Sequence, residues 1–243
     1  RPTGTLTGNA FMKMLLGALG YDSKIEGYTG PNWTVNVIKQ AAGIGLDDGN
    51  DEFVGSKAVT REEAALYAFN MLQATMVEYD AKTTVDVNGA TITIAGDKAQ
   101  DKSWGTATNN DGNIKDDGFV QFAEQNFDKL VLKADTVDDF GRPANTWRFK
   151  GVEVGTFPKT ADATYTADVK IGQIYSDLGM SDKDEKAEVY VDGVKADELA
   201  KVSKGNDLKV SELKFDGSVT CDVGNGTKIE AFLNEDTNDV TIV

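Results

Sequence analysis

The sequence predicts an α+β protein in which a helical region, residues 1–79, precedes a mainly β domain, residues 80–243, that holds one or two helices. Three observations support this prediction. Apolar residues recur every three or four positions in the first third of the chain, which is the period of an amphipathic helix. Apolar and polar residues alternate in most of the remainder, as in half-buried strands. Two short stretches of helical period interrupt that alternation.

Three helices are expected in residues 1–79. Their apolar positions are, in order, Phe11, Leu15 and Leu19; Trp33, Val37 and Ala41; and Ala65, Phe69, Leu72 and Met76. Gly20 can end the first helix because glycine adopts a positive φ without strain. Thr60 and Glu63 form the S/T-x-x-E pattern of a capping box, so the third helix is expected to begin directly after Thr60.

Strands are expected to dominate after residue 80. The segments TTVDV (83–87) and ATITIA (90–95) flank Asn88-Gly89, a pair that favours a tight hairpin turn. The segments KAEVYVDGVKA (186–196) and TKIEAFLNEDTNDVTIV (227–243) each have the pattern of two strands joined by a turn.

Two helices are expected between these strands. The first is DGFVQFAEQNFDKL (117–130), whose aromatic side chains are interpreted as core residues. The second is IGQIYSDLG (171–179), which is expected to end at Gly179.

Composition limits the chemistry that the chain can perform. It has 40 acidic and 25 basic residues, a net charge of −15 and no cluster of Lys and Arg, so nucleic acid is not an expected partner. No stretch approaches the roughly 18 apolar residues of a membrane-spanning helix, and no membrane insertion is expected. Histidine is absent, and the single cysteine, Cys221, is interpreted as a small buried strand residue. A protein without catalytic activity is therefore expected.

Two acidic stretches, LDDGNDE (46–52) and NNDGNIKDDG (109–118), offer the oxygen ligands that Ca²⁺ prefers. Neither matches the EF-hand pattern D-x-[DN]-x-[DN]-G-x5-E, so the motif does not support Ca²⁺ binding. Both stretches are interpreted as solvated turns, and no cofactor is expected.

A repeat links the first and third expected helices. The segment TGNAFMKMLLGAL (7–19) aligns with TREEAALYAFNML (60–72), and Thr7 matches Thr60. A period near 50 residues is typical of stacked copies of one helical unit. The copies differ at their starts, because Gly8 stands where the second copy has Arg61, and Ala10 stands where it has an acidic residue.

The order of motifs across residues 1–79 resembles the S-layer homology family, whose repeats run from a TRAE-like helix start through a Trp-bearing helix to a glycine-rich loop. The corresponding segments here are TGNAFMKMLLGALGY, GPNWTVNVIKQAAGIGL and DDGNDEFVGSKAVTREEAALYAFNML. The resemblance implies an extracellular protein of the cell wall or S-layer of a Gram-positive bacterium, with further repeats before Arg1. It also implies anchoring to an acidic cell-wall polysaccharide, often with a pyruvylated sugar, and self-association in a surface array.

The same resemblance implies that Arg61 is the anion contact, that Trp33 is an aromatic wall and that Thr60 is the cap that positions them. A guanidinium offers a carboxylate a planar fork of donors, and a helix start adds partial positive charge. From the residues alone, Arg61 can equally be a solvated first-turn residue, and Trp33 can fill the space between helices with one edge exposed. Because Gly8 replaces the arginine, the first copy is expected to bind acidic sugars poorly.

Two other functions stay open from the sequence. Residues 80–243 can act as an adhesin-like module that recognises a ligand on a host or neighbouring cell. A glycan-acting hydrolase would need two carboxylates that face each other, and none of the 40 acidic residues stands out as such a pair.

Overall fold

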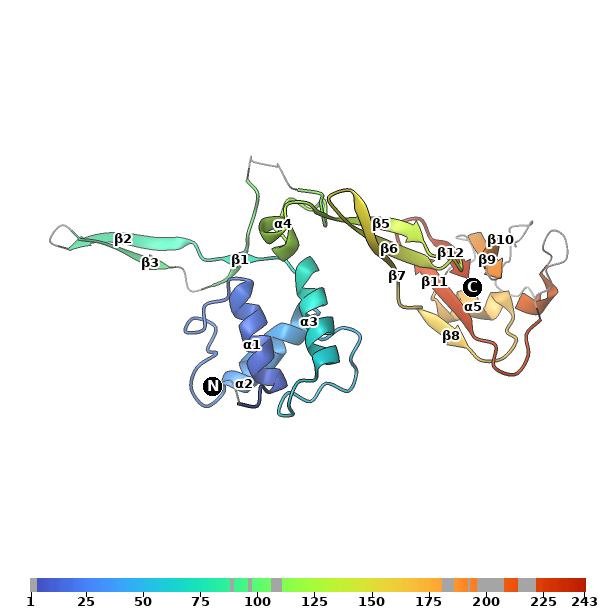
Figure 1. The fold of residues 1–243 in the computed structure, drawn as a ribbon, viewed down its shortest axis with the longest axis horizontal. Helices are drawn as coiled ribbons and strands as arrows, with labels where there is room; N and C mark the ends of the chain where they lie inside the picture. Colours follow the sequence, from blue (N-terminus) through green and yellow to red (C-terminus); the bar gives the residue numbers. More distant parts are fainter. Residues whose placement is uncertain are drawn as a thin grey trace. The chain divides into compact units, whose positions relative to one another are not determined.

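The computed structural model describes residues 4–87, 90–95, 98–105, 111–180, 186–191, 193–195, 208–213 and 222–243. These residues form a mixed α+β structure with five α-helices and largely antiparallel sheets (Figure 1). The chain divides into two compact units, residues 1–131 (unit 1) and residues 132–243 (unit 2). The boundary expected after residue 79 lies inside unit 1. No helix in the described ranges combines the length and apolar character needed to cross a membrane.

Unit 1 is built around three helices, α1 (Gly8–Ala18), α2 (Trp33–Gly43) and α3 (Arg61–Gln73), at the positions expected from the apolar period. Their inward faces form one core, in which the fully buried side chains include Met12, Leu16, Leu19, Val37 and Tyr67. The chain leaves α1 through Gly20, whose φ is 107°. A Cβ at Gly20 would lie 2.3 Å from the carbonyl oxygen of Val77, so this close approach requires glycine.

Residues beyond 79 complete the core of unit 1. Strands β1 (Val77–Glu78) and β4 (Gln100–Asp101) pair in antiparallel fashion. Next to them, the N–H of Met76 donates to the carbonyl of Val120 at 2.8 Å, and the N–H of Val120 donates to the carbonyl of Lys102 at 2.8 Å. Val120 is buried in the same core as the three helices. The unit therefore extends past the residue at which the sequence period changes.

The prediction of a helix over residues 117–130 is wrong in length, because the observed helix is much shorter. Helix α4 spans Phe122–Asn126, and Phe119 and Phe127, which were expected in the core, are 38% and 44% exposed. Glu124 explains the late start of α4. Its buried carboxylate accepts backbone N–H groups from Gln121, Ile114 and Lys115 at 3.1, 2.9 and 3.2 Å, which fixes the first turn after an extended Gln121.

The hairpin expected after residue 80 is confirmed. Strands β2 (Ala81–Val87) and β3 (Ala90–Ala95) are antiparallel, with Val87 opposite Ala90. The predicted turn residues Asn88 and Gly89 lie outside the described residues.

The described residues from 130 onward form two sheets, with strand orders β5-β6-β7 and β10-β9-β12-β11-β8. The strands are β5 (Leu130–Val137), β6 (Pro143–Phe149), β7 (Val152–Pro158), β8 (Ala163–Tyr165), β9 (Lys186–Val191), β10 (Val194–Lys195), β11 (Ile229–Asn234) and β12 (Asp239–Ile242). In the second sheet the pairs are antiparallel except β9 with β12, which is parallel. The predicted strand pairs in 186–196 and 227–243 are confirmed.

Helix α5 (Ile171–Asp177) and the short 3₁₀ helix η1 (Val210–Glu212) cover this second sheet and supply its core with apolar side chains. Ile171 and Ile174 of α5 are fully buried against Ala231 and Ile242 of the sheet. Helix α5 stops just before Gly179, as expected. Cys221 and Asp192 lie outside the described residues.

Candidate functional site

Thr60 caps α3 as the sequence predicts. Its Oγ1 accepts the backbone N–H of Glu63 at 3.1 Å, and Oε2 of Glu63 accepts the backbone N–H of Thr60 at 2.7 Å. The backbone N–H of Thr60, and then its side chain, hold the pKa of Glu63 below its ordinary value. This reciprocal pair fixes the backbone direction of the first turn, in which Arg61 and Glu62 lie.

Thr7 caps α1 at the equivalent position of the repeat. The N–H of Ala10 donates to Oγ1 of Thr7 at 3.3 Å, but Ala10 has no carboxylate to return the bond. The extended residues before the two caps pair with each other, with the N–H of Val59 donating to the carbonyl of Leu6 at 2.9 Å. Thr7 lies opposite Ala58 in this antiparallel bridge. The two repeated helix starts therefore lie side by side.

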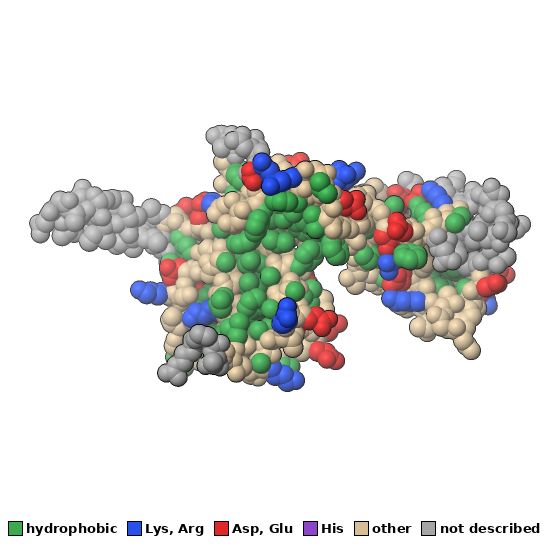
Figure 2. All heavy atoms as spheres, viewed as in Figure 1, with side chains coloured by type: hydrophobic (Ala, Val, Ile, Leu, Met, Phe, Trp, Pro, Cys, Tyr) green, Lys and Arg blue, Asp and Glu red, His purple; other side chains and the backbone are tan. Residues whose placement is uncertain are grey.

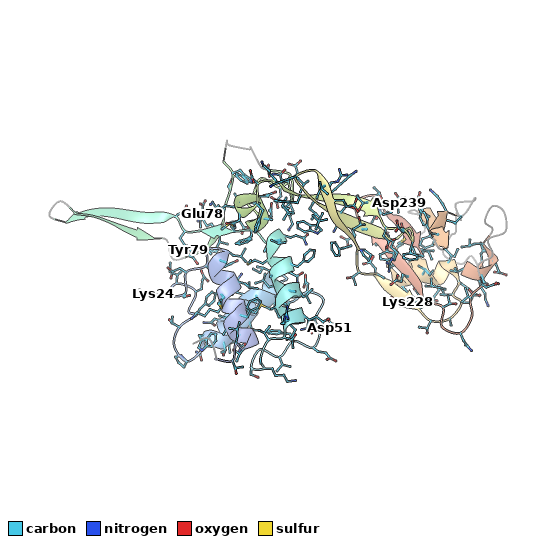
Figure 3. The ribbon with its side chains drawn as sticks, viewed as in Figure 1. Lys24, Asp51, Glu78, Tyr79, Lys228 and Asp239 are labelled. Atoms are coloured by element: carbon cyan, nitrogen blue, oxygen red, sulfur yellow. The ribbon has the colours of Figure 1, made fainter. Side chains whose placement is uncertain are left out.

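Arg61 is the first residue of α3 and is exposed. Its side chain forms no hydrogen bond or ion pair with any residue that the structure describes. Its neighbours Thr60 and Glu62 line a cleft of about 440 Å³, which we call the cap cleft, although Arg61 itself is not part of the lining. The opposite wall is a loop that includes Asn50 and Glu52, and Figure 3 labels Asp51 of that loop near the start of α3.

Gly8, the counterpart of Arg61, is buried beneath the same loop. A Cβ at Gly8 would lie 2.9 Å from Cε2 of Phe53 and 3.2 Å from Cα of Gly55. Phe53 is held in place by an edge-to-face contact with Tyr67, with ring centroids 5.6 Å apart and an interplanar angle of 82°. The Tyr67 hydroxyl accepts Nδ2 of Asn50 at 2.6 Å, which anchors the loop further. Packing therefore leaves no room for an arginine in the first copy.

The cap cleft carries more negative than positive charge. Its charged residues are Glu52, Glu62 and Glu63 against Lys57. Figure 2 shows a similar mixture over the face drawn, where acidic and basic side chains of the described residues are interspersed. A densely charged anion would be repelled by these carboxylates, whereas a ligand with one carboxylate at Arg61 and hydroxyl groups elsewhere is compatible with them.

Trp33 occupies the first position of α2 and is partly buried against the unit 1 core. The ammonium nitrogen of Lys13 lies 5.4 Å from the centroid of its ring and donates to the carbonyl of Tyr28 at 2.6 Å. Trp33 is thus a core residue with partial exposure, next to a cation that the sequence did not single out. It is not part of the cap cleft, so that cleft does not bring Trp33 together with Thr60.

Glu124 was not predicted from the sequence, although its carboxylate fixes both the start of α4 and the loop at Ile114 and Lys115. Gly118 and Glu124 have the G-x5-E spacing of an EF-hand loop, which could have drawn attention to it. Here both carboxylate oxygens accept backbone N–H groups. Among the described residues, no three acidic or cysteine side chains gather where they could hold a metal ion.

Comparison with known proteins finds no matching family model, no matching curated protein and no matching solved structure. The resemblance of residues 1–79 to the S-layer homology family therefore stays a prediction that rests on the order of its motifs.

Proposed function

We propose that unit 1 is a non-catalytic module of a bacterial cell-surface protein and that it binds an acidic cell-wall glycan through Arg61. The observation that carries this proposal is the state of Arg61: a guanidinium exposed at a capped helix start, with no partner among the described residues. At this position the free N–H groups of the first turn add to the positive potential. A carboxylate on a sugar would form charge-assisted hydrogen bonds with the guanidinium.

The carboxylates around Arg61 limit the density of negative charge that this glycan can carry. Glu52 and Glu62 can accept hydrogen bonds from sugar hydroxyls, but they disfavour a second negative charge nearby. The proposed ligand therefore has isolated carboxylates, such as one pyruvyl group per repeating unit, separated by uncharged sugars. Thr60 acts indirectly in this scheme, because it fixes the turn from which Arg61 extends.

Isothermal titration of the full chain with purified pyruvylated wall polysaccharide tests this proposal. Loss of a charge-assisted contact of about 1.5–3 kcal/mol predicts that Arg61→Ala weakens binding roughly tenfold to a hundredfold. Enzymatic or mild-acid removal of the pyruvyl groups should reduce binding of the native chain by a similar factor and leave Arg61→Ala unchanged.

Arg148→Ala is the matched control, because it removes the same charge from an exposed strand residue in unit 2. Equal weakening by Arg61→Ala and Arg148→Ala would show a general charge effect and would contradict a contact at Arg61. Absence of binding by the native chain would overturn the proposal itself.

A further inference from the structure

A second cleft in unit 1 differs from the cap cleft in position and in chemistry. It has a volume of about 430 Å³ and lies where the C-terminal ends of α2 and α3 meet β4 and the loop 111–118, and we call it the C-terminal cleft. The residues that matter for its chemistry are Tyr21, Asp48, Asn70, Gln73, Asp101 and Lys115. It shares no residue with the cap cleft.

Asn70 and Tyr21 each form hydrogen bonds that fix the walls of this cleft, and each keeps one further hydrogen-bonding group that a ligand could use. Nδ2 of Asn70 donates to the carbonyl oxygens of Leu46 at 3.1 Å and Asp48 at 2.9 Å, so Asn70 can offer its Oδ1 as an acceptor. The hydroxyl of Tyr21 accepts Nε2 of Gln40 at 3.0 Å, so its own hydrogen is left to donate.

The loop after α2 turns the Asp48 carboxylate back over the backbone of Gly45, which also lines the cleft. A Cβ at Gly45 would lie 2.5 Å from Oδ2 of Asp48, and the φ of Gly45 is 71°. Glycine is therefore required for this carboxylate to stand where it does.

The charges of the lining disfavour an anionic ligand, because two carboxylates, Asp48 and Asp101, outnumber the single ammonium group of Lys115. What the cleft offers instead is a mixture of acceptors, on two carboxylates and Asn70, and donors, on Lys115 and Tyr21. Sugar hydroxyls both donate and accept, so they match such a mixture.

We infer that the C-terminal cleft binds an uncharged sugar residue. This inference does not rest on the proposed role of Arg61, since the two clefts have separate linings and Arg61 belongs to neither. If both hold, unit 1 contacts a glycan at an acidic sugar and also at an uncharged one.

The test is a nitrogen-15 NMR titration of the full chain with glucose, mannose, N-acetylglucosamine and their β-linked disaccharides. We expect saturable shifts of the backbone amides of Gly45, Gln73 and Thr75 with at least one of these sugars. Glucuronic acid, which has a similar ring but carries a carboxylate, should bind more weakly. Absence of saturable shifts at these amides with every uncharged sugar would overturn the inference, as would tighter binding of glucuronic acid.

Two substitutions then test whether the sugar binds to the residues that line the C-terminal cleft. Gln73→Ala and Asp101→Ala should each weaken binding, the latter by about tenfold, because a hydrogen bond to a charged group is lost. Asp51→Ala removes the same charge from an exposed loop outside this cleft and should leave the affinity unchanged. Unchanged affinity in both Gln73→Ala and Asp101→Ala would contradict this site.

Discussion

The ring of Phe53 lies directly over Gly8, so that a Cβ on Gly8 would come within 2.9 Å of it. This relationship explains why the two aligned helix starts differ at the residue that follows the cap. The loop that carries Phe53 covers the first helix start and forms a wall of the cleft beside the second. The start of α1 is therefore buried beneath this loop, whereas Arg61 at the start of α3 is exposed.

Gly8→Ala is expected to destabilise the protein by about 1–3 kcal/mol, because the added methyl group must displace the Phe53 ring or the backbone of Gly55. Urea unfolding monitored by tryptophan fluorescence measures the change. Gly17→Ala is the control on the same helix. No other atom lies within 4 Å of a Cβ at Gly17, so that substitution should stabilise the protein by about 0.5–1 kcal/mol. Equal effects at both glycines would contradict the packing argument.

Thr60→Ala should cost about 1 kcal/mol of unfolding free energy, because the N–H of Glu63 loses its acceptor. Thr60→Ser keeps the hydroxyl and should restore most of that loss. Both variants can be compared with the native chain by thermal unfolding. If the serine variant were as unstable as the alanine variant, the cap bond would not be the source of the effect.

The capping box also predicts a dependence of stability on pH. The pKa of Glu63 in the folded protein is below its ordinary value of 4.5. Its ionised form therefore stabilises the fold above about pH 4.5, and this contribution is lost as the pH falls through the folded pKa. The native chain should be more stable than Glu63→Gln at pH 7, and the difference should shrink on acidification. Glu62→Gln removes the same charge from outside the box, and an identical pH dependence in that variant would contradict this assignment.

Glu124→Gln is expected to destabilise unit 1 by about 1–3 kcal/mol, since an amide cannot accept all three backbone N–H groups that the carboxylate accepts. Hydrogen exchange at the Ile114 amide should accelerate together with the loss of stability. Gln125→Ala changes the exposed next residue and should stay within about 0.5 kcal/mol of the native chain. Unaltered exchange at Ile114 would show that Glu124 does not hold this loop.

Local signals predicted most of the secondary structure. The cap at Thr60, the three helices of unit 1 and the strand pairs in 186–196 and 227–243 each depend on residues close in sequence, and all of them are confirmed. The short α4 could not be predicted in this way. Its limits are set by bonds from Glu124 to residues ten and nine positions earlier, which no helical period reveals.

The candidate site was predictable only in part, for the same reason. The capping box placed Arg61 at a helix start, but burial of Gly8 depends on the loop residues Phe53 and Gly55 folding back over α1. The C-terminal cleft gathers residues from Tyr21 to Lys115, and no motif spans that separation. The extent of unit 1 depends likewise on Val120 entering a core formed by much earlier helices.

The bond between Val59 and Leu6 joins the residues directly before the two caps, Thr60 and Thr7. In this bond the residue before the second cap donates and the residue before the first accepts, so the two helix starts are not interchangeable at the bridge. The backbone therefore distinguishes the two starts, as does the packing of Phe53 on Gly8.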